Sequence, residues 1–213
     1  EQLPGRAGAA DDGMTDGARA VSNEEFFARL GQRLIHFLTT RTSGGILYEV
    51  DMRLRPSGKS GPLVAALAAF REYQQAHAWT WEHQALVRAR AVAGESRLCA
   101  AFEEVRREIL CRPRDLERLR TEVREMRRKM AATHAADAAG FNVKHDRGGI
   151  VDIEFMVQYG VLRWAHEHPG LTRHTDTIGI LEALAAEDLL AGAKVRTLIG
   201  AYRRYLSAEH RLK

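Results

Sequence analysis

The spacing of apolar positions predicts a chain built mostly of helices. Apolar residues follow helical spacing in a first segment, which Ser22 or Asn23 can cap and which ends near Thr42. Glycine and proline positions separate this segment from the helical patterns that follow it. The further helices are predicted at 67–76, 79–87, 95–110, from Pro113 to 130, from Ile150 to about His166, at 176–186 and from Ala193 onward, with a short extended piece at Phe141 to Lys144.

One segment, from Tyr48 to Arg55, alternates with a period of two instead. Side chains in a strand point alternately to opposite faces, about 6.6 Å apart along each face. The pattern therefore predicts a strand with an apolar face that packs on a core and a polar face that carries two acids followed by two bases. The apolar face holds Tyr48, Val50, Met52 and Leu54, and the polar face holds Glu49, Asp51, Arg53 and Arg55.

The two patterns together predict an α+β chain that is mostly helical. Residues 1–22 are rich in Gly, Ala and Asp without an apolar period, which predicts a flexible loop. Residues 23–95 combine helix and strand, and every convincing element of residues 96–213 is helical. We therefore expect a mixed domain followed by a helical bundle. The uncapped helical pattern at Lys213 and the absence of a starting Met are typical of a fragment.

Composition narrows the class of protein. The 213 residues are 45% hydrophobic and 28% charged, which allows a real core in a soluble chain. A net charge of +4 does not by itself indicate nucleic acid, and the arginine-rich stretch from Arg112 to Lys129 is interpreted as a solvated helix face. There is no apolar run of membrane-spanning length, no signal peptide pattern and no CxxC spacing, so we expect a cytoplasmic protein without a membrane partner.

The polar face of the predicted strand suits phosphate chemistry. Asp51 can hold Mg²⁺, which prefers oxygen ligands, and Glu49 is a further candidate. Arg53 and Arg55 can bind phosphate oxygens in bidentate fashion. The loop that follows adds backbone N–H groups, the Ser57 hydroxyl and Lys59, and could cradle a triphosphate, although it is not a Walker A motif. The alternative is a half-exposed strand with cross-strand ion pairs.

A second candidate site lies at the start of the helix that begins at Ile150. Gly148 and Gly149 can let an anion approach the helix N-terminus, and Lys144 and Arg147 lie beside them. Asp152 and Glu154 are further candidates, since they are carboxylates in an otherwise apolar segment. Their two-residue spacing places them about 200° apart around the helix, so one could face the site while the other pairs with a basic residue. The alternative is helix capping with buried salt bridges.

Three segments together resemble a known family, the bacterial glutamine synthetase adenylyltransferases, also called adenylyl-tyrosine phosphorylases. The resemblance lies in residues 38–64 (LTTRTSGGILYEVDMRLRPSGKSGPLV), 79–94 (WTWEHQALVRARAVAG) and 141–155 (FNVKHDRGGIVDIEF). It covers nearly the whole chain from about residue 23. The resemblance implies that residues 23–95 are the C-terminal part of a polymerase β-like nucleotidyltransferase domain and that residues 96–213 are a truncated helical bundle domain.

The family resemblance also implies a reaction. Family proteins have two nucleotidyltransferase halves: one adds AMP from ATP to a tyrosine hydroxyl of glutamine synthetase, and the other removes it by phosphorolysis. The residues from Thr39 to Thr42, with Ser57-Gly58 after Pro56, are more similar to the C-terminal, adenylylating half. The alternatives are the phosphorolytic half and a protein-binding segment without catalysis. The implied partners are ATP, glutamine synthetase and a nitrogen-regulatory signalling protein, and not a nucleic acid.

The family's catalytic head uses three carboxylates with Mg²⁺ or Mn²⁺, and Asp51 matches the third. The first two belong to a Gly-Ser…Asp-x-Asp motif, and no such motif precedes Ser22. The resemblance therefore implies that Asp51 is a catalytic metal ligand and that this segment alone is inactive. A competing metal hypothesis is a zinc site at His166, His168 and His174, which lack the convergent spacing that zinc sites need.

Overall fold

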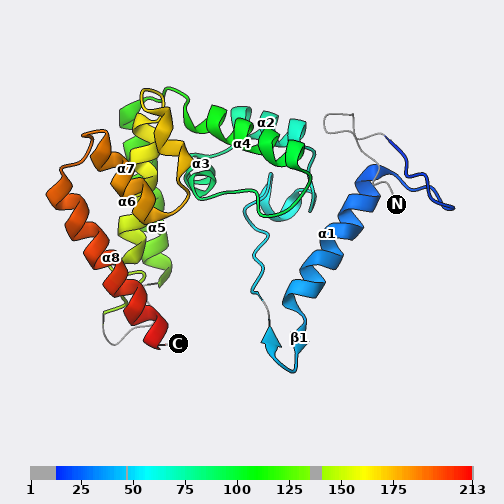
Figure 1. The fold of residues 1–213 in the computed structure, drawn as a ribbon, viewed down its shortest axis with the longest axis horizontal. Coiled ribbons are helices and arrows are strands. Elements are labelled where there is room, and N and C mark those ends of the chain that lie inside the picture. The colour runs from blue at the N-terminus through cyan, green and yellow to red at the C-terminus, as the bar shows by residue number, and fades with distance from the viewer. Residues whose placement is uncertain (1–12, 47, 135–140, 213) are drawn as a thin grey trace. The chain divides into compact units, whose positions relative to one another are not determined.

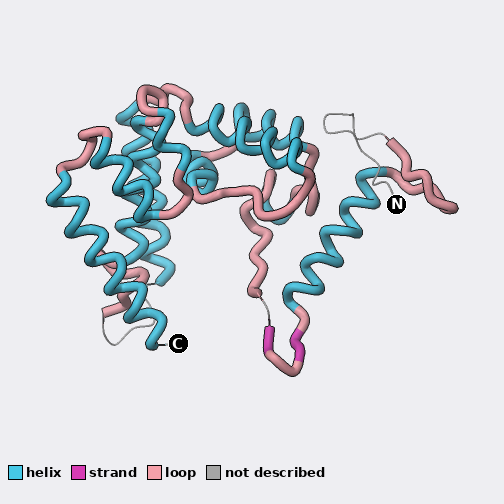
Figure 2. Tube along the Cα trace, viewed as in Figure 1, coloured by secondary structure: helices cyan, strands magenta, loops and turns pink. Residues whose placement is uncertain are grey.

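The computed structural model describes residues 13–46, 48–134 and 141–212, and it divides the chain into two compact units. The first unit contains residues up to Ala78 together with 95–100, and the second contains 79–94 and 101–213. Helices dominate both units, as the ribbon and the tube show (Figure 1, Figure 2). The predicted boundary near residue 95 and the domain identities stay predictions.

The first unit begins with helix α1, Asn23–Thr39. Ser22 caps it by accepting a hydrogen bond from the Glu25 N–H at 3.2 Å. Residues 13–22 of the predicted loop carry an isolated bridge between Met14 and Ser22, and residues 1–12 lie outside the described residues. No residue of α1 is buried, and Phe37 is 72% exposed.

A two-stranded antiparallel hairpin follows α1. Strand β1, Arg41–Thr42, pairs with strand β2, Gly45–Ile46, in the register Arg41 to Ile46 and Thr42 to Gly45. Among the described residues this hairpin is the sheet of the fold (Figure 2). The prediction of a mostly helical chain is confirmed, whereas the sheet of a polymerase β-like domain stays a prediction.

The predicted strand from Tyr48 to Arg55 is wrong for the structure as described, because no residue of this segment joins a strand ladder. Local bonds from side chains compete with a ladder here. The Asp51 carboxylate accepts the Arg53 N–H at 2.9 Å, and the Arg55 guanidinium donates to the Met52 carbonyl at 2.6 Å. Part of the predicted apolar face is also open to solvent, since Leu54 is 64% exposed.

The rest of the first unit is a loop and a helix. The 3₁₀ turn η1, Gly58–Ser60, lies within the loop that joins residue 55 to helix α2, Leu67–Ala76. Both bounds of α2 agree with the helical spacing. Helix α4, Ser96–Leu110, begins in this unit and continues into the second.

The second unit is a bundle around one apolar helix. Helix α6, Ile150–Trp164, packs against four other helices and a 3₁₀ turn. Ile153, Val157 and Val161 are buried along it, as the nearly continuous apolar sequence predicts. Its neighbours are α3 (Thr80–Val87), α5 (Leu116–His134), η2 (Pro169–Arg173), α7 (Thr177–Ala186) and α8 (Gly192–Leu212) (Figure 1).

Two smaller predictions are settled by the bundle. The extended piece expected at Phe141 to Lys144 is wrong, because residues 143–145 form a turn whose Val143 and Lys144 carbonyls accept the first N–H groups of α6. The sequence of residues 88–93 is compatible with either a helix or a short strand, and in the structure these residues form neither. Among the described residues no helix has the length and apolar character that crossing a membrane requires.

Candidate functional site

Asp51 and Arg53 form the candidate site of the first unit. The Arg53 Nε lies 3.0 Å from Oδ1 and 2.9 Å from Oδ2 of Asp51, and its Nη2 lies 2.7 Å from Oδ2. The two side chains therefore share one polar surface, as the alternation predicted, but Arg53 binds the carboxylate itself. Glu49 is exposed nearby in the sequence.

This pairing fixes the charge on Asp51. Hydrogen bonds from the Arg53 side chain and backbone, with Lys59 as a more distant positive charge, lower the pKa of Asp51 from 3.8 to about 2. The carboxylate is therefore ionised at neutral pH. An exposed, ionised carboxylate is a ligand that Mg²⁺ or Mn²⁺ accepts.

Arg55 organises the loop that follows. Its guanidinium donates to the carbonyls of Met52 at 2.6 Å, Lys59 at 3.3 Å and Gly61 at 3.4 Å. These bonds hold Lys59 and Gly61 of the loop close to Met52, the residue that precedes Arg53. The Ser57 and Lys59 side chains are exposed on this loop, whereas the Arg55 guanidinium is already engaged by backbone carbonyls.

The Gly148-Gly149 turn is closed by its own hydrogen bonds. Gly149 N–H donates to the Asp146 carbonyl at 3.0 Å, and Ile150 N–H donates to the Val143 carbonyl at 2.9 Å. Gly148 has φ of +88°, and a Cβ at Gly149 would lie 2.5 Å from the Val143 carbonyl oxygen. Glycine is therefore required here by close packing of the turn. Phosphate binding by Gly148 and Gly149 stays a prediction, and in this arrangement their N–H groups already have partners.

Asp152 completes this turn. Its Oδ2 accepts the Gly148 N–H at 2.6 Å, and its Oδ1 pairs with Arg127 of α5. Arg127 also donates to the carbonyl of His145 at 2.8 Å. The carboxylate thus takes the place at the helix N-terminus that favours an anion. Lys144 lies 3.6 Å from Glu209, and Arg147 is exposed.

Glu154 lies on a different side of α6, as the two-residue spacing predicted. Its Oε1 accepts from the Arg88 Nη1 at 2.7 Å and from the Tyr202 hydroxyl at 2.9 Å. Burial raises the pKa of Tyr202, whose oxygen also accepts from Thr177 at 3.3 Å. Both carboxylates of the motif therefore pair with basic residues.

Sequence reasoning missed the arginines that organise this unit. The interpretation of the Arg112–Lys129 stretch as a solvated face is wrong at Arg114 and Arg127. Burial lowers the pKa of Arg114 to about 10, and its Nη1 lies 3.0 Å from His83 Nδ1. Arg106, on α4, is 2% exposed. The signal available was position, since Arg106 follows Val105 within the apolar spacing of its helix.

Metal ligands do not gather elsewhere in the described chain. Among residues 13–46, 48–134 and 141–212 no group of three or more His, Cys, Asp or Glu side chains is placed to hold a metal ion. His168, a member of the zinc hypothesis, lies 2.8 Å from Glu187 instead. Asp51 lies in the first unit, and the Gly148-Gly149 turn lies in the second.

Comparison with known proteins gives two family matches. Residues 8–105 match the model of glutamate-ammonia ligase adenylyltransferase, and residues 114–213 match that of GlnD PII-uridylyltransferase. The Asp51 loop falls in the first match and the Asp152 turn in the second.

Full-length relatives extend the likeness across both parts. The chain is 57% identical to the bifunctional glutamine synthetase adenylyltransferase/adenylyl-removing enzyme of Pseudomonas aeruginosa, over 93% of the chain and 22% of that protein. It is 55% identical to the protein of the same name from Thioalkalivibrio sulfidiphilus, over 96% of the chain and 21% of that protein. The chain therefore spans about a fifth of the length of these curated relatives. The family predicted from the three motifs is therefore confirmed. The chain belongs to the bifunctional glutamine synthetase adenylyltransferase/adenylyl-removing enzymes and corresponds to one segment of them.

Proposed function

We propose that this chain supplies one part of a nucleotidyltransferase that moves AMP from ATP to a tyrosine hydroxyl of glutamine synthetase. The observation that carries the proposal is the ionised Asp51 carboxylate, which is held by Arg53 beside an ordered loop. The printed names of the relatives supply the reaction class and the protein substrate. Transfer by the whole protein would regulate the activity of glutamine synthetase, and through it nitrogen assimilation.

The reaction requires a nucleophile, a base and charge compensation. The tyrosine oxygen attacks the α-phosphorus of ATP, a P–O bond forms to tyrosine, and the bond to pyrophosphate breaks. The tyrosine proton leaves to a base, and the products are adenylyl-tyrosine and pyrophosphate. Once Arg53 has moved away, Asp51 would hold a metal ion near the nucleophile or accept that proton.

Asp51 alone supplies the kind of ligand that Mg²⁺ or Mn²⁺ prefers, a carboxylate. When bound, such an ion lowers the charge on the triphosphate and activates the attacking oxygen. Arg53 covers both carboxylate oxygens in the described structure, and its side chain is 73% exposed. It is therefore free to move from Asp51 to a phosphate oxygen when nucleotide binds.

The surrounding residues take supporting roles in this proposal. Lys59 and the Ser57 hydroxyl extend from a loop that Arg55 holds in shape through three carbonyl contacts. Lys59 adds a positive charge that suits the leaving pyrophosphate. In the second unit, the exposed Arg147 and the Lys144 ammonium are the groups that remain able to reach an anion, since Asp152 takes the Gly148 N–H. Glu49 is a second carboxylate candidate.

Two other functions follow from the same family. The first is phosphorolysis, in which phosphate attacks adenylyl-tyrosine and releases ADP; a carboxylate such as Asp51 would serve there as well. The second is binding without catalysis, in which the helical bundle docks glutamine synthetase or a nitrogen-regulatory signalling protein. The similarity of Thr39–Thr42 to the adenylylating half favours AMP transfer over both.

A chimera tests the proposal. This chain replaces the matching segment of the Pseudomonas aeruginosa relative, and both directions are measured: transfer of labelled AMP from ATP to glutamine synthetase, and phosphate-dependent release of that label. Asp51→Asn is compared with Glu72→Gln, which changes an exposed carboxylate of α2. We expect Asp51→Asn to abolish transfer and spare release. Loss of release alone would support the phosphorolytic alternative, and wild-type rates in both directions would overturn a catalytic role.

A further inference from the structure

A buried arginine lies at the end of α3. Arg106 of α4 is 2% exposed, and burial lowers the pKa of its guanidinium. A charged side chain at this depth is costly unless its donors are satisfied. The contacts of Arg106 therefore indicate what the fold gains from placing it there.

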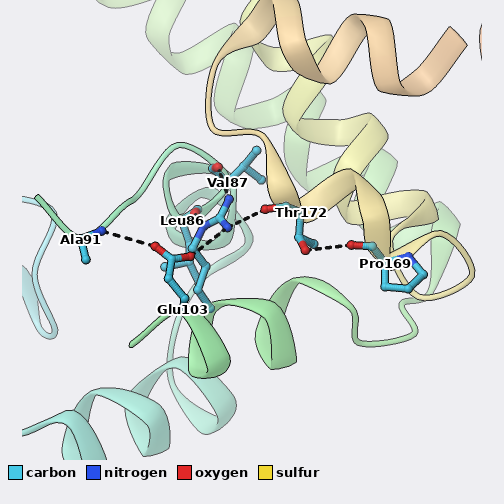
Figure 3. A network of polar contacts seen from close by, with 7 residues as sticks. Leu86, Val87, Ala91, Glu103, Pro169 and Thr172 are labelled. Atoms are coloured by element: carbon cyan, nitrogen blue, oxygen red, sulfur yellow. Dashed lines mark hydrogen bonds and ion pairs between the residues drawn. The ribbon is translucent and has the colours of Figure 1, made fainter. Parts of the chain in front are cut away.

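Arg106 binds three backbone carbonyls of two separate segments. Figure 3 shows the residues that supply them, Leu86, Val87 and Thr172. Its Nε donates to the Leu86 carbonyl at 3.0 Å, and its Nη2 donates to the Val87 carbonyl at 2.6 Å. Its Nη1 donates to the Thr172 carbonyl of η2 at 2.7 Å. The last carbonyls of a helix lack partners within the helix, and a cation there is favourable. Arg106 thus caps α3 and ties its end to η2.

Glu103 of α4 contacts both Arg106 and the segment that follows α3. Its Oε2 lies 3.4 Å from the Arg106 Nη1, and its Oε1 accepts the Ala91 N–H at 3.3 Å (Figure 3). The segment 86–91 is therefore held by α4 at both of its ends. Between those ends lies Arg88, whose Nη1 is 2.7 Å from the Glu154 Oε1.

We propose that Arg106 is a positioning residue that fixes segment 86–91 so that Arg88 reaches Glu154. The proposal joins two of the motif segments, 79–94 and 141–155, through a residue that belongs to neither. Free rotation of Arg88 about the end of an uncapped helix would leave the Glu154 carboxylate with Tyr202 alone. The inference concerns the bundle and does not depend on the proposed nucleotidyl transfer.

Hydrogen exchange and a double-mutant cycle test this proposal on the full chain. Arg106→Lys keeps the charge but replaces a planar donor set that reaches three carbonyls with a single ammonium. Arg107→Lys makes the same change at the next, exposed position and is the matched control. We expect the Ala89 and Ala91 amides to exchange about tenfold faster or more in Arg106→Lys, with α7 unchanged. The coupling between Arg88 and Glu154, measured with Ala at each position, should fall to near zero in that background.

Each of several results would by itself overturn the positioning role of Arg106. Wild-type exchange at residues 89–91, or an undiminished Arg88–Glu154 coupling, would overturn the positioning role. Equal acceleration over all helices of the bundle would also overturn it, because Arg106 would then serve only general stability. If Arg106→Lys fails to fold, Glu103→Ala serves instead: exchange at Ala91 should rise about tenfold while Ala89 stays within about twofold. A uniform rise from 86 to 91, or none, would contradict the proposal.

Discussion

The carboxylate of Asp152 accepts the backbone N–H of Gly148 at 2.6 Å and so occupies the N-terminal end of its own helix. A helix N-terminus preceded by glycines is a common place for a bound phosphate. Here α6 carries its own anion, and Arg127 neutralises it from α5. The turn from Asn142 to Gly149 is consequently a folded structural element of the bundle, and its exposed basic side chains are the groups available for other contacts.

Removing that carboxylate should destabilise the bundle. Asp152→Ala leaves Arg127, whose side chain is 15% exposed, without its ion pair and leaves the Gly148 N–H without an acceptor. We expect a loss of about 2 kcal/mol in the free energy of unfolding, measured by urea denaturation. Glu125→Ala, at an exposed position of α5, should stay within about 0.5 kcal/mol of the parent. Equal stability of the two variants would contradict the assigned role of Asp152.

Gly149 should tolerate no side chain. A Cβ at this position would lie 2.5 Å from the Val143 carbonyl oxygen and 3.0 Å from that of Asp146. Gly149→Ala should therefore lower the free energy of unfolding by about 2 kcal/mol or more. Gly200→Ala is the control of opposite sign: nothing lies within 4 Å of its Cβ, and it lies inside α8. That variant should gain about 0.5–1 kcal/mol. A neutral Gly149→Ala would show that the turn is not packed as described.

The pKa of Asp51 should depend on Arg53. The carboxyl pKa is about 2 in the folded chain against 3.8 without its partners, so the pairing stabilises the folded state fully above pH 3.8. This contribution is lost as the pH falls from about 4 to about 2. Arg53→Gln should return the carboxyl pKa toward 3.8, measured by NMR titration of the side-chain carboxyl. Arg71→Gln, at an exposed position of α2, is the control that should leave it low. An unchanged pKa in Arg53→Gln would contradict the pairing.

The Tyr202 hydroxyl should stabilise the junction of α6, α7 and α8. Tyr202→Phe removes the donor to Glu154 and the acceptor of Thr177 while it keeps the ring in place. We expect a loss of about 1 kcal/mol. Tyr205→Phe makes the same change about one turn further along α8 and should be nearly neutral. Among the described residues the Tyr205 hydroxyl makes no side-chain hydrogen bond. Equal losses would contradict a specific role for Tyr202.

Helices were predictable because their signals are local. The apolar spacing gives α2 at Leu67–Ala76 and the start of α6 at Ile150, and the Ser22 cap follows from residue type alone. The segment from Tyr48 to Arg55 failed because strand structure depends on a partner that alternation does not supply. There the side chains of Asp51 and Arg55 bind nearby backbone groups instead.

The candidate site was predictable in part for the same reason. Asp51 and Arg53 share a polar surface because they are two residues apart, and the resemblance picked out the carboxylate. The pairs of Asp152 with Arg127 and of Glu154 with Arg88 span 25 and 66 positions. Spacing along one helix gives the direction of each carboxylate but does not identify a partner on another helix. The sequence alone therefore predicts a solvated face for the stretch from Arg112 to Lys129.

The most direct test of the central claim is a single-turnover rate. In the chimera with the Pseudomonas aeruginosa relative, transfer of AMP from ATP to glutamine synthetase is measured for the parent and for Asp51→Asn at saturating ATP and metal ion. If Asp51 is the catalytic carboxylate, the rate should fall by at least about a hundredfold, whereas Glu72→Gln should match the parent. A rate for Asp51→Asn within about twofold of the parent in both transfer and phosphorolysis would contradict the account.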